Sequence, residues 1–195
     1  MLDNKHFNKK IVYAGSDVFS VQPLKKLLNL KYKNVSVLTR PPKRQGRGMK
    51  QKNNPLADFA LHNNLQILTP EKPNDNDFLA KLEEKKYDVL ISCAYGRVMS
   101  EKLLECFHMG SINIHPSLLP RWRGPSPIES SILEGDKITG VSLMQMTQEL
   151  DAGPVYEQRS ISMNGENAKD LSEKLAILAG DMIESFLPSF FEGDA

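Results

Sequence analysis

The sequence predicts an α/β fold, with a Rossmann-like, mostly parallel sheet that is covered by helices on both faces. Short apolar runs alternate along the chain with segments of helical spacing, which is the pattern of parallel strands joined by helices. The run YDVLISCAY at 87–95 is apolar almost throughout, as in a strand buried on both faces. The length of 195 residues, 40% of them hydrophobic, suits a single domain with a substantial core.

In the first half of the chain, apolar runs predict strands over 9–15, 35–39, 65–68 and 87–95. Helices are predicted between them, over roughly 18–29, 55–62 and 75–86. The first of these helices repeats apolar residues at helical spacing, at Val18, Val21, Leu24, Leu27 and Leu28. Asn54-Pro55 is typical of a helix start, because Asn caps the first turn and proline fits the first helical position. Residues 40–54 hold prolines and glycines and predict a long loop.

In the second half, helices are expected over about 100–107, 126–134 and 167–187, with strands at 111–114, 141–146 and 154–161, the last as a hairpin partner. The final helix carries one apolar stripe, made of Leu171, Leu175, Leu178, Met182 and Phe186. The segment HPSLLPRWRGPSP holds four prolines and predicts a loop. Because the sequence contains no repeat and no linker, we treat residues 1–195 as one domain.

Charge is divided unevenly along the chain, although the net charge is only +1. Residues 1–52 hold 13 Lys and Arg against 2 acidic residues, and residues 53–195 hold 12 against 22. This asymmetry predicts one face suited to a polyanion. The basic residues gather in RPPKRQGRGMKQK (40–52), where glycines would let the backbone approach phosphates closely. A solvated basic loop is the alternative.

The cysteine count and the apolar runs bear on the compartment. Two cysteines, Cys93 and Cys106, cannot form a disulfide framework, which favours a reducing compartment. The N-terminus MLDNKHFNKKI has no apolar signal-peptide core, and no apolar run approaches the ~18 residues of a membrane span. We expect the bacterial cytoplasm, with the mitochondrial matrix as the alternative, and we expect a monomer.

A candidate catalytic pair lies at the end of a predicted strand. Asn113 and His115 are two residues apart, so their side chains point the same way. An amide donor beside an imidazole suits an oxyanion site with a proton-handling group. Three turn-forming X-Pro elements downstream predict that the pair is exposed, and Asp151 in LDAGP could orient the histidine. The alternatives are a structural histidine and an aspartate that only forms a turn.

Other catalytic patterns are missing from the sequence. Neither G-x-G-x-x-G nor G-x-x-x-x-G-K-[ST] occurs, which removes the main support for a dinucleotide or P-loop site. The four histidines and two cysteines show no metal-ligand spacing. Cys93 is expected to be a buried filler, and without a G-x-S-x-G pattern Ser117 has no case as a nucleophile.

Taken together, these segments resemble the 10-formyltetrahydrofolate-dependent formyltransferases. The resemblance rests on SINIHPSLLPRWRGPSPIESSILEGDKITGVSLMQMTQELDAGPVY (111–156), on KIVYAGSDVFSVQPLKKLL (10–28), on SCAYGRVMS (92–100) and on the GRG-containing loop. The composite N-x-H-x-S-L-L-P-x-x-R-G followed by D-x-G-P is highly specific, whereas no single piece of it would be. Members that act on methionyl initiator tRNA are most similar, and the resemblance covers about 10–187.

The resemblance implies a formyltransferase fold, with Asn113, His115 and Asp151 as the catalytic residues. It implies transfer of a formyl group from 10-formyltetrahydrofolate, as co-substrate and with no metal, to the α-amino group of methionyl initiator tRNA in translation initiation. The implied folate-binding residues are Ser117, Leu118, Leu119, Pro120, Tyr95, Gly96 and Arg97. The implied tRNA-binding residues are Arg40, Lys43, Arg44, Arg47 and Lys50.

Members of the family normally continue into a C-terminal β-barrel domain that helps to hold tRNA, and this chain stops before it. Weak affinity for tRNA is therefore expected. Two alternatives keep the chemistry and change the acceptor, to glycinamide ribonucleotide or to an amino sugar nucleotide. A third alternative is a non-catalytic RNA-binding domain that uses the basic face alone.

Overall fold

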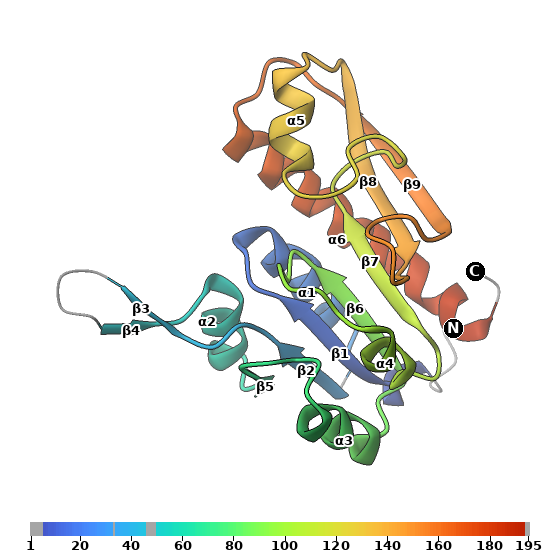
Figure 1. The fold of residues 1–195 in the computed structure, drawn as a ribbon. Helices are drawn as coiled ribbons and strands as arrows, with labels where there is room; N and C mark the ends of the chain where they lie inside the picture. Colours follow the sequence, from blue (N-terminus) through green and yellow to red (C-terminus); the bar gives the residue numbers. More distant parts are fainter. Residues whose placement is uncertain (1–5, 33, 46–49, 194–195) are drawn as a thin grey trace.

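The computed structural model describes residues 6–32, 34–45 and 50–193, and these surround a seven-stranded sheet (Figure 1). The strand order is β5-β2-β1-β6-β7-β8-β9, with parallel pairing from β5 to β7 and antiparallel pairing of β8 and β9. The predicted, mostly parallel α/β sheet is thereby confirmed. The strands are β1 (Lys10–Gly15), β2 (Asn34–Leu38), β5 (Gln66–Leu68), β6 (Val89–Cys93), β7 (Ser111–His115), β8 (Ile138–Gln145) and β9 (Val155–Ser162).

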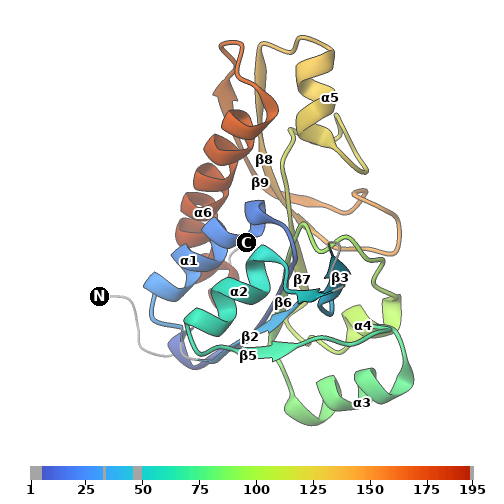
Figure 2. The same ribbon diagram turned by 90° about the vertical axis from the view of Figure 1, so that its left-hand side faces the viewer.

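Helices cover both faces of the sheet (Figure 2). On one face lie α1 (Val21–Asn29), α2 (Pro55–His62) and α6 (Ala168–Glu192), and a single large apolar core joins them to the sheet. On the other face lie α3 (Asn76–Lys85) and α4 (Glu101–Glu105), which enclose a second, smaller core. The short helix α5 (Pro127–Leu133) packs near the N-terminal half of α6. None of the described helices is long and apolar enough to cross a bilayer.

Capping fixes the helix starts that the sequence predicts. The Asn54 side chain accepts a hydrogen bond from the backbone N–H of Ala57, and Pro55 occupies the first turn of α2. Asn167 caps α6 in the same way through the N–H of Asp170. A 3₁₀ turn, Val18–Ser20, precedes α1, and Val18 is exposed rather than part of the apolar stripe. The reason is that the α-helical repeat begins only at Val21.

The segment 40–54 differs from the predicted loop. It contains β3 (Lys43–Gln45) and β4 (Lys50–Lys52), which pair antiparallel and project from the body of the molecule (Figure 1). Both strands consist of polar residues, so the sequence shows no alternation of apolar and polar residues that would predict them. Arg47 lies outside the described residues.

The final helix also extends further than predicted, to Glu192, with Pro188 inside it. A proline in a helix interior typically costs about 3 kcal/mol, which is why the sequence predicts an end near Leu187. Phe190 and Phe191 lie beyond the proline and are buried in the larger core. Their burial offsets that cost, at about 1.5–3 kcal/mol for each side chain.

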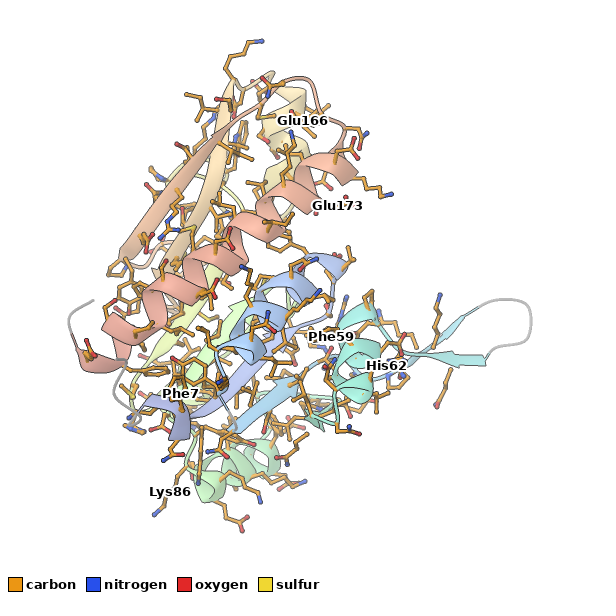
Figure 3. The ribbon with its side chains drawn as sticks, turned by 180° about the vertical axis from the view of Figure 1, so that it is seen from behind. Phe7, Phe59, His62, Lys86, Glu166 and Glu173 are labelled. Carbon is orange, nitrogen blue, oxygen red and sulfur yellow. The ribbon has the colours of Figure 1, made fainter. Side chains whose placement is uncertain are left out.

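The N-terminal end of α6 carries an ion pair that predicts a pH dependence of stability (Figure 3). Glu166 pairs with Lys174 and accepts the backbone N–H of Asn164 at 2.6 Å, and these contacts lower its pKa to about 2. The unfolded value is about 4.3, so the ionised carboxylate stabilises the folded chain above that pH. We expect this contribution to disappear as the pH falls from about 4.3 to about 2.

Urea unfolding between pH 5 and pH 2.5 measures the effect. The Glu166→Gln variant should lose part of the acid dependence seen in the wild type. The control is Glu173→Gln on the same helix, where the carboxylate is largely exposed and 4.0 Å from Lys169. Parallel pH profiles for the wild type and Glu166→Gln would contradict the assignment.

Candidate active site

The strand β7 presents two polar side chains on the face of the sheet away from α6. Ile112 and Ile114 belong to the core that α6 completes, so alternation directs Asn113 and His115 to the opposite face. Both side chains contact the same carboxylate, which confirms that they point the same way. The face that they share is the floor of the candidate site.

The carboxylate of Asp151 lies next to both of the other candidate catalytic side chains, Asn113 and His115. Its Oδ1 accepts a hydrogen bond from Asn113 Nδ2 at 3.1 Å, and its Oδ2 accepts one from the backbone N–H of Gly124 at 2.9 Å. His115 Nδ1 lies 3.5 Å from the same Oδ2, and both side chains are more than nine-tenths buried. The structure thus brings the three candidate catalytic residues into one cluster, from β7 and from the loop after β8.

The second nitrogen of the His115 ring is also engaged. His115 Nε2 lies 2.8 Å from the carbonyl oxygen of Trp122, which can only accept a hydrogen bond, so Nε2 carries a proton. The sequence predicted an exposed pair, and for His115, which is 5% exposed, that expectation is wrong. The reason is that the proline-rich segment 116–125 folds back over the histidine, and the carbonyl of Trp122 accepts a hydrogen bond from its ring.

The predicted folate-binding turn, 117–120, is fixed from beneath by β8 and β9. Ser142 Oγ accepts the backbone N–H of Leu119 and donates to the carbonyl of Ser117. Gln158 Nε2 donates to the carbonyl of Leu119 and to Ser142 Oγ. Ser117 itself is fully buried and donates to the carbonyl of Arg121, which agrees with its having no nucleophilic role. Leu118 is half-buried and Pro120 is exposed.

Sequence reasoning missed Ser142 and Gln158. Both lie on strands, and the residue types alone do not distinguish them from other polar strand residues. Their only signal is period-two alternation, which would place Ser142 on the same face as the turn once the register with His115 is known.

The segment Tyr95-Gly96-Arg97 follows the carboxyl end of β6. The Tyr95 hydroxyl is buried and has no hydrogen-bond partner among the described residues. Burial raises the pKa of Tyr95, although Arg97 and Arg40 nearby lower it, so the phenol remains a donor. Arg97 Nη1 donates to the carbonyl oxygens of Pro70 and Glu71, which ties this segment to the loop after β5.

The basic residues divide between two places. The Arg40 guanidinium lies beside Gly96, where a Cβ would come within 3.7 Å of its Nη1. Lys43 and Lys52 are cross-strand partners in the β3–β4 pair, and Arg44 and Lys50 belong to the same two strands. Arg40 therefore lies next to the predicted pterin segment, while the other described members of the set belong to the projecting hairpin (Figure 1).

Other candidate chemistry is not supported by the part of the chain that the structure describes. No group of three or more His, Cys, Asp or Glu side chains there could hold a metal ion. Cys93 is fully buried in β6, and burial raises the pKa of its thiol to about 12. The expectation of a buried filler is confirmed.

Comparison with known proteins identifies relatives over most of the chain. Residues 9–186 match the protein-family model described as Formyl transferase. The chain is 42% identical over 167 residues to the methionyl-tRNA formyltransferase of Buchnera aphidicola, covering 85% of this chain and 53% of that protein. It is 37% identical over 186 residues to the protein of the same name from Coxiella burnetii, covering 95% and 59%. The chain spans little more than half the length of these relatives.

Solved structures share the fold. A phosphoribosylglycinamide formyltransferase from Anaplasma phagocytophilum superposes with a TM-score of 0.76 at 22% identity, covering 95% of this chain and 88% of that one. An N-formyltransferase from Helicobacter canadensis, solved with folinic acid and dTDP-3-aminofucose, superposes with a TM-score of 0.72 at 22% identity, covering 95% and 65%.

The Asp151 cluster predicts a large loss of stability on truncation. The Asp151→Ala change leaves Asn113 Nδ2 and the Gly124 N–H without their acceptor. Each buried polar group without a partner costs about 1–3 kcal/mol, so we expect a loss on the order of 3 kcal/mol in the free energy of unfolding.

Chemical unfolding at pH 7 measures this loss. Glu149→Ala removes an exposed carboxylate from the same loop and serves as the control, with a change within about 0.5 kcal/mol. Asp151→Asn keeps one oxygen acceptor and tolerates the left-handed backbone at φ 49°, so it should fall between the two. Equal stability of Asp151→Ala and Glu149→Ala would disprove the central role of this carboxylate.

Proposed function

The chain belongs to the formyl transferase family, and we propose that it transfers a formyl group from 10-formyltetrahydrofolate to the α-amino group of methionyl initiator tRNA. The observation that carries the proposal is the convergence of Asn113 and His115 on the buried carboxylate of Asp151. The names of the relatives at 37–42% identity support methionyl-tRNA as the acceptor. Because those relatives are bacterial translation enzymes by name, we place the reaction in the cytoplasm.

The residues around the site fit a folate co-substrate. A pterin is a planar polar ring, and Tyr95 offers a buried hydroxyl that has no partner among the described residues. Gly96, at φ 72°, leaves its backbone open on the side where only Arg40 approaches. The turn of Ser117, Leu118, Leu119 and Pro120 would hold the donor near β7, and Tyr95, Gly96 and Arg97 would hold the pterin. Bound there, the folate supplies the formyl group.

The proton leaving the attacking amine is assigned to His115. Its Nε2 proton is donated to the Trp122 carbonyl at 2.8 Å, so Nδ1 of the neutral ring carries no proton, and Asp151 Oδ2 lies 3.5 Å from it. Nδ1 is therefore the nitrogen that accepts the amine proton. Asp151 then faces a ring with a proton on each nitrogen, and its negative charge stabilises that form. When the bond between the formyl carbon and N10 of the folate breaks, this proton balances the step by passing to N10, so that tetrahydrofolate leaves as the neutral amine.

The negative charge that develops on the formyl oxygen is assigned to Asn113. The amide group of Asn113 has two N–H donors, and the contact with Asp151 uses one of them. The second donor has no hydrogen-bond partner among the described residues and can bind the oxygen as its charge grows. A strand residue is well suited to this task, because its position is fixed before the substrate arrives.

The tRNA acceptor would meet the basic residues. Lys43, Arg44 and Lys50 lie on the projecting hairpin, and Arg40 lies at its base; Arg47, outside the described residues, completes the set. A second candidate acceptor is glycinamide ribonucleotide or an amino sugar nucleotide, because solved structures of the same fold carry those names.

A comparison of acceptors tests the proposal. The purified chain is mixed with 10-formyltetrahydrofolate and, in separate reactions, methionyl initiator tRNA, glycinamide ribonucleotide or an amino sugar nucleotide. We expect formyl-methionyl-tRNA to form fastest. The His115→Ala variant should lose roughly 10²–10⁴ in kcat while it still binds folate. Faster transfer to either small acceptor would replace the proposed substrate, and no transfer to any acceptor would favour a binding domain.

The assignment of Asn113 makes a separate prediction. Because the oxyanion exists only in the transition state, Asn113→Ala should lower kcat by roughly 10²–10³ and leave the KM for the formyl donor nearly unchanged. Asn113→Asp should be at least as damaging, since it puts a second carboxylate beside Asp151. Steady-state kinetics on folded variants measure both. Near-normal kcat in folded Asn113→Ala would mean that this side chain only supports the Asp151 loop.

A further inference from the structure

The orientation of the His115 ring depends on a backbone group. The carbonyl oxygen of Trp122 binds Nε2 at 2.8 Å, and two residues later the N–H of Gly124 binds Asp151 Oδ2 at 2.9 Å. One short stretch of backbone, 122–124, thus contacts both His115 and Asp151. Whatever fixes the conformation of this stretch also fixes the geometry of the proton-handling pair.

Trp122 has an uncommon backbone conformation. Its φ is 60°, in the left-handed region that bulky side chains rarely adopt, so its side chain must be well held for the conformation to persist. Two contacts hold it. The indole Nε1 donates to Asp136 Oδ2 at 2.8 Å, and the Arg121 guanidinium stacks over the indole ring at 4.2 Å.

Asp136 binds both neighbours at once. Its Oδ2 also accepts Arg121 Nε at 3.0 Å, and its Oδ1 accepts Arg121 Nη2 at 2.7 Å, which is the bidentate geometry of a strong arginine–carboxylate pair. The arginine lowers the pKa of Asp136, as does the indole N–H. Asp136 lies in the turn between α5 and β8, and its backbone N–H donates a hydrogen bond to the carbonyl of Ser131 at 3.0 Å.

We propose that Asp136 is a positioning residue for His115: by clamping the indole of Trp122 and the guanidinium of Arg121, it holds the Trp122 carbonyl against Nε2. The clamp does not touch the reacting atoms. It keeps His115 Nε2 hydrogen-bonded to the Trp122 carbonyl, so that Nδ1 faces Asp151 and the amine. The inference rests on the proposed function only where it predicts a change in turnover; the effect on the ring is independent of the substrate.

Two readouts test the clamp, using Asp136→Ala, Asp136→Asn and Trp122→Phe. The first is the ring ¹⁵N–¹H spectrum of the labelled chain, which contains four histidines and is assigned with His115→Gln. Loss of one hydrogen bond should make exchange of the His115 Nε2 proton roughly tenfold faster in Asp136→Ala. The second is steady-state kinetics, where kcat should fall roughly 10–100-fold while the KM for the formyl donor stays nearly constant.

The three variants differ in how many of the Asp136 hydrogen bonds they remove. Asp136→Ala removes both contacts, Trp122→Phe removes only the indole donor, and Asp136→Asn keeps an oxygen for the indole and should recover part of the loss. Trp122→Phe answers the question if Asp136→Ala does not fold. The matched control is Glu157→Ala, which removes a carboxylate that also binds an arginine, Arg159 Nε at 2.6 Å, on the α6 side of β9.

The outcomes separate the clamp from a purely structural ion pair. Faster Nε2 exchange and lower kcat in Asp136→Ala and Trp122→Phe, with the wild-type pattern in Glu157→Ala, support the inference. An unchanged His115 spectrum or an unchanged kcat in either folded variant overturns it, even if the melting temperature falls. If the wild type proves to use a different acceptor, the ring spectra still decide the role of Asp136, while the proposed function fails on its own.

Discussion

The candidate site depends on one carboxylate. Asp151 accepts hydrogen bonds from the side-chain amide of Asn113 on β7 and from the backbone N–H of Gly124 in the following loop, and its Oδ2 lies 3.5 Å from His115 Nδ1. Because buried polar groups must be paired, the loop after β8 and the proline-rich segment 116–125 pack over β7 in an arrangement that gives both donors this acceptor. The hydrogen bonds to Asp151 therefore fix two things at once, the position of the loops over the sheet and the arrangement of the candidate catalytic side chains.

The segment 116–125 shows how a loop without regular structure becomes rigid. Its backbone carbonyls at Ser117, Leu119, Arg121 and Trp122 each accept a hydrogen bond from a side chain. Those side chains come from β7, β8, β9 and the loop itself, so the sheet fixes the loop at several points. Four prolines between 116 and 127 further restrict the backbone. The result is a site whose parts are placed before any substrate binds.

Most of the fold could be predicted from apolar periodicity and caps, because the sheet is buried and its strands are nearly continuous apolar runs. The pair Asn113 and His115 could be placed on one face for the same reason, since alternation along a strand is geometric. The features that the sequence did not predict depend mostly on contacts between residues far apart in the chain. The strands β3 and β4 are polar throughout, and α6 continues past Pro188 because of aromatic burial. The burial of His115 and the partners Ser142, Gln158 and Asp136 follow from tertiary contacts that no local pattern encodes.

The contact between α1 and α6 has a consequence for the order of folding during synthesis. Gly180 lets the two helices approach closely, since a Cβ there would come within 2.8 Å of Lys26 Cγ, and Lys26 pairs with Glu184 across 158 residues. The ribosome makes the apolar face of α1 well before α6, the helix that covers it. Until then the first βα unit exposes its apolar side to other chains and to chaperones. The larger core of this sheet therefore stays incomplete in the nascent chain until α6 has been made, and stable folding of the sheet waits for that helix.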